Sequence, residues 1–218
     1  EAVVRTSTMA GDASKELDPS TPTALAGNRI QSFTATGFVV GSDPDVNESG
    51  TGRKYHWLAM QAGAGAMKVG TYVGNGTAQT ISGLGFAPVY VMVLPSNARD
   101  AVQRGASMPA GFSATFNAYA WAGSVTSFTS DGFVVGSSTT ANESGVTYHY
   151  VAWASVPGAV AVGSYAGNGS DNRNVTGTGF LPAWALVTRT WSDGRTGSSL
   201  GNAPAQKPSS TGLSVDLA

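Results

Sequence analysis

The stretch FTATGFVVGS at residues 33–42 returns almost unchanged as FTSDGFVVGS at residues 128–137, 95 positions further along the chain. Phe, Val and Thr favour strands, and the glycine in the middle of each stretch permits a tight turn between two of them. Each stretch therefore predicts two short strands joined by a turn, and this pair of strands occurs twice.

Further blocks recur in the same order, with spacings of 93 to 95 residues: NESG at 47–50 and 142–145, YHWLA at 55–59 and YHYVA at 148–152, VGTYVGNG at 69–76 and VGSYAGNG at 162–169, GLGFAPVY at 83–90 and GTGFLPAW at 177–184. Upstream, Arg5 and Met9 match Arg104 and Met108. Repetition of this kind has to be identified before any single motif is interpreted. It predicts two tandem copies of about 95 residues, at 1–97 and 98–190, followed by a tail at 191–218.

The composition indicates an all-β chain, with 29 glycines in 218 residues and only 11% charged residues. Helices exclude glycine from their interiors and draw on Leu, Glu and Lys. Asn75 and Asn168 each precede a glycine, and Asn-Gly is the strongest short signal of a β-hairpin turn. Residues 55–61 carry apolar side chains on both faces, which predicts a central strand. We therefore predict two tandem antiparallel β-sandwich repeats of jelly-roll or immunoglobulin-like type.

Several functional classes conflict with the composition. The net charge is −1, without the clustered cations that bind nucleic acid. The chain has no cysteine, which excludes disulfides and thiolate metal sites. The most apolar stretch, 151–167, is interrupted by Pro157 and Gly158 and falls short of the roughly 20 apolar residues of a membrane helix. The Gly-x-Gly steps precede strands rather than helices, so we expect no cofactor.

One loop resembles the opening of a calcium site. Asp43, Asp45 and Asn47 place oxygen ligands at alternate positions. A calcium loop of the EF-hand type needs Gly at its sixth position and Glu at its twelfth, where this chain has Glu48 and Lys54. The second copy lacks both aspartates. A solvated turn is the favoured interpretation, with calcium as a weak candidate.

The two histidines, His56 and His149, occupy equivalent positions in the repeat. Glu48 and Glu143 are the repeated acids, so a Glu–His pair in each copy is one interpretation. A catalytic histidine needs a nucleophile or an orienting carboxylate within reach. Two equal active sites in tandem are unusual, and a buried structural histidine bonded to a loop is favoured.

Most tryptophans and tyrosines fall at positions expected to face a core. Trp121 and Trp191 lie outside the repeated blocks and are the candidates for contacts with a glycan. For an enzyme, which is the weakest interpretation, the residues of interest would be Arg99, Asp100 and Arg104 between the copies. No catalytic motif supports that interpretation, and we expect no enzymatic activity.

The repeated phrases Gly-Phe-x-Val-Gly, Asn-x-Ser-Gly, Gly-x-Tyr-x-Gly-Asn-Gly and Gly-Phe-x-Pro resemble those of repeat modules in phage virion and tail-fibre-like proteins and in secreted bacterial surface proteins. The resemblance covers most of residues 1–190, and the tail departs from it. It implies an extracellular, cell-surface or virion location and a structural or adhesive role. It supplies no catalytic residues.

The tail ends in an alternating pattern in which Leu213, Val215 and Leu217 share one face. We predict that this strand docks on a sheet edge, either in its own chain or in a neighbouring subunit, and strand addition to a neighbour would build polymers. Deleting residues 211–218 should then abolish polymers and leave a folded monomer. The function predicted from the sequence is a structural subunit of an extracellular fibre, surface layer or phage-tail-like appendage. A glycan-binding, adhesive module of a larger secreted protein is the alternative.

Overall fold

The computed structural model describes residues 2–17, 21–50, 52–116, 120–188, 205–208 and 215–216, and at 120–122, 205–208 and 215–216 the description covers the backbone. The protein is predominantly β, with its strands in several antiparallel sheets, as the composition predicts. Within this part of the chain, no helix is long and apolar enough to cross a membrane.

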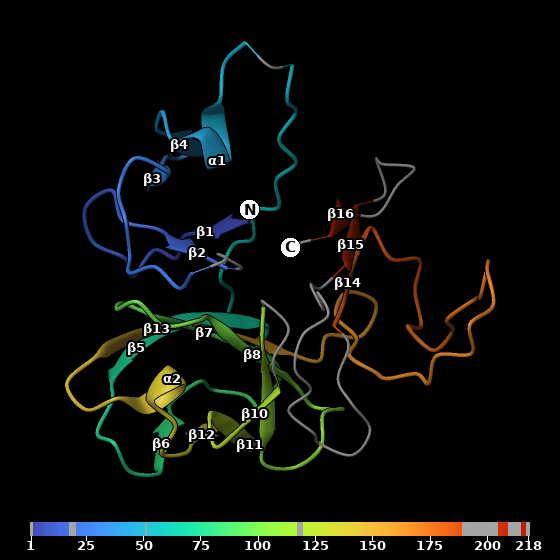
Figure 1. Cartoon of the computed structure of the whole chain (residues 1–218). Coiled ribbons are helices and arrows are strands. Elements are labelled where there is room, and N and C mark those ends of the chain that lie inside the picture. The colour runs from blue at the N-terminus through green and yellow to red at the C-terminus, as the bar shows by residue number, and fades with distance from the viewer. Residues whose placement is uncertain are drawn as a thin grey trace.

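The largest body of structure, which we call the central module, spans residues 66–154 (Figure 1). A six-stranded sheet has the order β10-β9-β8-β7-β13-β5, and a three-stranded sheet has the order β11-β12-β6. The elements are β5 (Met67–Val73), β6 (Gln79–Ser82), β7 (Pro88–Pro95), β8 (Val102–Gly105), β9 (Phe112–Thr115), β10 (Ala120–Ala122), β11 (Val125–Thr129), β12 (Gly132–Val135), α2 (Thr139–Asn142) and β13 (Thr147–Ala154).

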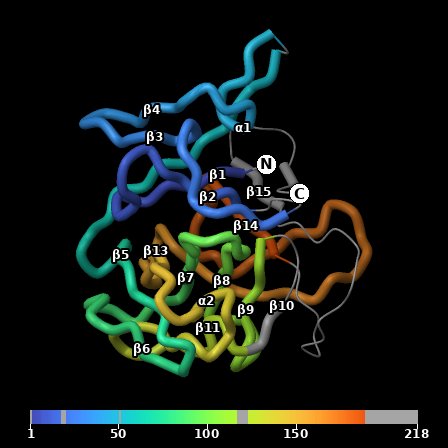
Figure 2. The backbone as a smooth tube through the Cα atoms, turned by 60° about the vertical axis from the view of Figure 1, so that its left-hand side comes forward, coloured from blue at the N-terminus to red at the C-terminus, as the bar shows by residue number. Residues whose placement is uncertain are grey.

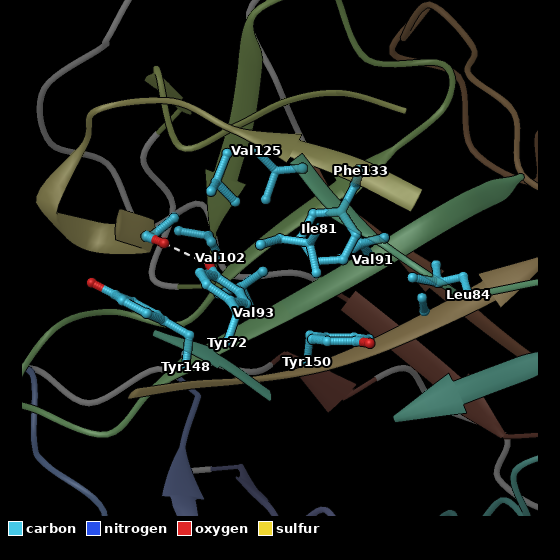
Figure 3. Close-up of a cluster of buried hydrophobic side chains, with 13 residues drawn as sticks. Tyr72, Ile81, Leu84, Val91, Val93, Val102, Val125, Phe133, Tyr148 and Tyr150 are labelled. Atoms are coloured by element: carbon cyan, nitrogen blue, oxygen red, sulfur yellow. Dashed lines mark hydrogen bonds between the residues drawn. The ribbon is translucent and has the colours of Figure 1, made fainter. Parts of the chain in front are cut away.

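Side chains from both sheets meet in one apolar core (Figure 3). Phe133 of β12 packs edge-on against Tyr150 of β13, with ring centroids 5.3 Å apart, and against Tyr72 of β5 at 6.2 Å. Tyr72 stacks on Tyr148 at 5.1 Å. Successive residues of a strand point to opposite faces, so one face of β13 supplies Tyr148 and Tyr150 to this core while the other faces away.

Strand pairing crosses the predicted boundary between residues 97 and 98, which falls in the turn between β7 and β8. β13 lies between β7 and β5, and β12 pairs with β6, so strands of the second copy are interleaved with strands of the first. A tandem repeat can begin its folded unit at any strand, since the period of the sequence is the same for every starting point. The tertiary pairing places one unit at residues 66–154.

Two segments flank the central module, and each holds only part of a repeat. The first segment, residues 2–62, contains β1 (Val3–Val4), β2 (Lys15–Glu16), β3 (Ile30–Phe33), β4 (Phe38–Val40) and α1 (Pro44–Asn47). The last segment, from residue 155 onward, contains β14 (Trp184–Val187), β15 (Ala205–Pro208) and β16 (Val215–Asp216).

Residues 52–62 run from α1 toward β5 without joining a sheet, so the prediction of a central strand at 55–61 is wrong for the first copy (Figure 1). The equivalent β13 is such a strand, covered on both faces. The physical reason is competition for partners, because β5 and β7, which follow residues 55–61 in sequence, both pair with β13.

The first segment packs over the face of the six-stranded sheet that is turned away from the core (Figure 2). Met9 and Leu17 join Leu94 and Phe116 in a second apolar cluster. The ammonium group of Lys15 is fully buried there and donates hydrogen bonds to the carbonyl oxygens of Thr23 and Asn97, the latter at 3.0 Å. Burial lowers the pKa of Lys15 to about 8.

Candidate functional site

The calcium candidate is occupied by an arginine. Asp43 caps α1 by accepting a hydrogen bond from the Asp45 amide at 2.9 Å. The Arg29 guanidinium lies 3.3 Å from carboxylate oxygens of both Asp43 and Asp45, and 3.1 Å from Glu16. The Asn47 side chain is engaged elsewhere, donating to the Gly41 carbonyl at 2.8 Å. These residues form an ion-pair cluster at a helix cap, and among the described residues no group of three or more His, Asp or Glu could hold a metal ion.

The histidines form no Glu–His pairs. His149 is buried on β13, where its Nδ1 lies 2.8 Å from the Thr8 hydroxyl of the first segment. Burial lowers the pKa of His149. Its expected partner, Glu143, instead accepts hydrogen bonds from Asn97 at 3.0 Å and Arg99 at 3.3 Å. His149 is thus a structural residue at the contact between the first segment and the central module. His56 lies exposed within residues 52–62.

Arg99 and Arg104, singled out for the enzymatic interpretation, do not converge on a cleft. Arg99 holds Glu143 at the surface. Arg104 is buried and donates hydrogen bonds to carbonyl oxygens of the loop before β9: to Pro109 at 2.9 Å, to Met108 at 3.4 Å and to Phe112. This set of contacts shapes a loop rather than a reaction site.

The remaining candidates lie where the structure describes little. The backbone of Trp121 pairs with Ser113 in the sheet, but its side chain is outside the described part, as are Trp191, Leu213 and Leu217. Val215 lies in β16 and pairs with Gln206 of β15 in the same chain. The glycan contacts at Trp121 and Trp191 stay predictions.

The most highly connected polar residue of the described chain is Asn142, which the sequence interpretation did not single out. Its carbonyl oxygen Oδ1 accepts from the Asn75 amide at 2.9 Å and from Gln79 at 2.8 Å. Its amide nitrogen donates to Gly136 at 2.6 Å and Thr77 at 2.5 Å. Asn142 therefore fastens the Asn75-Gly76 turn, which joins β5 to β6, onto the end of α2. Its recurrence in the unchanged NESG block was the available signal.

Asn47 is the counterpart of Asn142 and makes only part of these contacts. It donates to Gly41, just as Asn142 donates to the equivalent Gly136. No turn equivalent to that of Asn75 is seated against it, because that turn belongs to the central module. The side chain of Asn47 is thus one half of a clamp.

Two other repeated residues make matching contacts in both copies. The Tyr148 hydroxyl donates to Thr139 and accepts from the Glu143 amide, both at 2.8 Å, and the Tyr55 hydroxyl donates to Pro44 at 2.7 Å and accepts from the Glu48 amide at 2.9 Å. Arg5 holds the carbonyl oxygens of the loop at residues 9–13, as Arg104 does in the second copy. The first segment therefore has the local structure of a repeat without its full set of strands.

Large apolar side chains are exposed almost entirely outside the central module. Of the twelve that are exposed in the described chain, only Val73 lies within it. Trp57 is 72% exposed, whereas its counterpart Tyr150 is 5% exposed, and the matching values are 51% for Leu58 and 4% for Val151. The expectation that these aromatics face a core holds for Tyr72 of the central module and fails at Trp57 and at Tyr165, which is 46% exposed, because neither of these two lies in a described strand.

A family model described as a domain of unknown function, DUF7483, matches residues 109–196. The match covers 88 of the 218 residues, close to the length of one repeat, and runs from just before β9 to beyond β14. No curated protein and no solved structure matches the chain.

Proposed function

We propose that this protein is a non-enzymatic structural module that assembles with copies of itself in an extracellular fibre, surface layer or phage-tail-like appendage. Its architecture in that assembly is two β-sandwich units of about 95 residues, jelly-roll or immunoglobulin-like, one of which is the central module. Extracellular, cell-surface and virion locations fit the resemblance of its repeated phrases to such repeat modules.

The observation that carries the proposal is the placement of exposed apolar side chains. Eleven of the twelve large ones in the described chain lie on the two incomplete segments. Exposed apolar side chains concentrated on particular segments are expected where another molecule covers them. The residues shared by both copies support the same conclusion, since Arg5, Asn47 and Tyr55, like their counterparts, bind backbone groups of the scaffold rather than one another.

The test is the size of the purified full-length chain. Sedimentation over a range of concentrations, with electron microscopy of the same samples, should show oligomers or filaments that grow with concentration. A chain that stays monomeric at every concentration, up to about 1 mM, would overturn the proposal, because the weakest specific associations have dissociation constants near that value. Glycan-array binding by such a monomer would instead support the adhesive alternative.

A further inference from the structure

We infer that residues 160–187 of one copy pair with residues 54–61 of a second copy, so that two incomplete segments from different molecules form one complete module. This inference rests on the proposed self-assembly and identifies the surfaces that perform it. The segment at 160–187 corresponds to β5, β6 and β7, which are the strands that residues 2–62 lack.

The central module supplies the register for this pairing. There, β13 and β5 pair antiparallel, with Tyr150 opposite Gly70 and Ala152 opposite Lys68. Both strands recur in sequence at a spacing of 93 residues. The same register between two copies places Trp57 opposite Gly163 and Ala59 opposite Ala161.

Gly163 has a role in such a pairing and none in the isolated chain. A Cβ atom at the equivalent Gly70 would collide with the ring of Tyr150, which lies directly over it. At Gly163 nothing lies within 4 Å of a Cβ position, and its φ does not require glycine. Seating the Trp57 ring over Gly163 accounts for the glycine and covers a side chain that is otherwise 72% exposed.

The clamp residue Asn47 fits the Asn168-Gly169 turn of the last segment. Asn168-Gly169-Ser170 repeats the Asn75-Gly76-Thr77 turn that Asn142 fastens. In both turns the asparagine accepts a hydrogen bond from the amide two residues on, at 2.8 Å for Asn75 and 3.1 Å for Asn168. Within the described part of one molecule, Asn47 has no turn seated against it, and the Asn168-Gly169 turn is fastened by no asparagine equivalent to Asn142.

The other edge of residues 54–61 also has a partner in the same segment. β7 lies between β8 and β13, and in the described part of the chain its counterpart β14 pairs with β15, as β7 pairs with β8. By this correspondence, the other edge of β14 takes the place of the edge by which β7 binds β13. Residues 54–61 would then lie between two strands of the second copy, as β13 lies between β7 and β5.

Within one chain the parts that would pair are anchored at different strands, although Leu186 of β14 packs on the same apolar cluster as Val4 and Leu25 of the first segment. Met60 lies against β13, with its sulfur 3.2 Å from Trp153 Nε1. Gly163 lies beside the turn after β8, where its carbonyl accepts a hydrogen bond from Ser107 at 3.0 Å. β7 separates β8 from β13, so these anchor points are about 10 Å apart at the usual strand spacing. A second copy is therefore the occupant to which we commit.

One hydrogen-bond acceptor of the second repeat, a carboxylate in a turn, has no equivalent in the first repeat. Asp131, in the β11–β12 turn, accepts hydrogen bonds from the amides of Gly83 at 2.9 Å and Gly85 at 2.5 Å, between β6 and β7. The corresponding acceptor for Gly177 and Gly179 would be residue 36, which is a threonine. Thr36→Asp would supply the missing carboxylate, so it should strengthen the association several-fold.

The natural absence of cysteine allows a direct test of the register. Directly opposite residues of antiparallel strands have Cα atoms about 4.5–5.5 Å apart, which suits a disulfide. Ala59→Cys and Ala161→Cys chains, mixed and oxidised, should form a disulfide-linked dimer that contains one chain of each kind. Ala59→Cys mixed with Val162→Cys is the matched control, because residue 162 points to the opposite face. Failure of the first pair to cross-link, or equal cross-linking of the control, would overturn the inference.

A chain that carries both cysteines distinguishes pairing between two molecules from pairing within one molecule. The Ala59→Cys, Ala161→Cys double variant should give a ladder of linked chains on denaturing gels. A monomer with an internal disulfide would overturn the assignment to a second copy. If the native chain assembles but these pairs do not cross-link, the inference falls and the proposed function stands, whereas a chain that never assembles removes both.

A second variant tests the contact between Trp57 and Gly163. Gly163→Val should weaken assembly by about tenfold or more, since the added side chain meets the Trp57 ring. Ala161→Val is the control, because the equivalent position in the central module holds the larger Lys68 at an exposed site. Hydrogen exchange of β7 and β13 monitors the fold of both variants. Unchanged assembly of Gly163→Val would contradict the register.

Discussion

β13 and residues 54–61 have nearly the same sequence and opposite environments. β13 lies between β7 and β5 with Tyr148 and Tyr150 in the core, while residues 54–61 join no strand of the described chain and expose Trp57 and Leu58. Both retain their local contacts, including the tyrosine hydroxyl that bridges the ends of the short helix. The difference teaches that turns and caps form from local sequence, whereas burial of a strand depends on whether a partner strand remains available.

The largest difference in stability between the central module and the first segment is expected in the apolar core. Phe133→Ala should cost about 4 kcal/mol of unfolding free energy, because its ring is fully buried against Tyr72 and Tyr150. Phe38→Ala, the equivalent change in the first segment, should cost about 1 kcal/mol, since Phe38 is only half-buried and its ring contacts the exposed Trp57. Urea unfolding at low protein concentration measures both values, and equal costs would mean that the first segment already holds a complete core.

The clamp asparagines should differ in the same direction. Asn142→Ala leaves the Asn75 amide and the Gly136 and Thr77 carbonyl groups without their partner, for a loss of about 3 kcal/mol, since the Asn142 side chain that holds them is fully buried. Asn47→Ala removes one exposed hydrogen bond and should cost about 1 kcal/mol or less. The comparison is sharpened by concentration, since the cost of Asn47→Ala should grow when the chains assemble. A cost independent of assembly would argue against the shared clamp.

The arginines test the part of the repeat that is complete in both copies. Arg104 and Arg5 each bind loop carbonyl oxygens, and each lies over a phenylalanine ring, at 5.7 Å from Phe128 and 6.0 Å from Phe33. Arg104→Met and Arg5→Met should therefore cost similar amounts, about 2 kcal/mol each. Thermal unfolding compares them directly. A negligible effect of Arg5→Met would show that its loop is not held in the first segment.

The smallest effect on stability is expected at the contact between the first segment and the central module. Burial lowers the pKa of Lys15 from 10.5 to about 8, against the opposing influence of Asp100 and Glu16. Between these two values the unfolded chain binds more protons than the folded one, so stability rises with pH. From pH 7.5 to 9 the gain should be on the order of 1 kcal/mol. Lys15→Met should lack this increment in paired urea titrations, and a parallel pH dependence of the two proteins would contradict the burial of a charged lysine.

Much of the fold follows from local signals in the sequence. The glycine content and the β-rich runs predicted an all-β chain, and a turn forms at Asn75-Gly76 between β5 and β6. The predicted hairpin is wrong, because β5 pairs with β13 and β6 pairs with β12 of the other sheet, so the turn connects two sheets. A buried structural histidine was predicted at both positions and is observed at His149, whereas the prediction is wrong for His56, which is exposed. The site was harder to predict, because Asn47 was considered as part of a solvated turn, with calcium as a weak candidate, and no role was assigned to its counterpart Asn142. Their shared role depends on a turn 67 residues away in the chain, which no local pattern reports.

The sequence by itself determined the all-β class and the positions of the turns, since each depends on neighbours within a few residues. It also determined the period of the repeat, because the same blocks recur along the chain. Only the tertiary structure decided which copies of a strand pair, and hence where a folded unit begins and which segments remain incomplete. The reason is that two nearly identical strands, β13 and residues 54–61, compete for one β5 and one β7. The packing of the whole chain decides that β13 pairs with them. Residues 54–61 keep the apolar side chains of a central strand, but they join no described sheet.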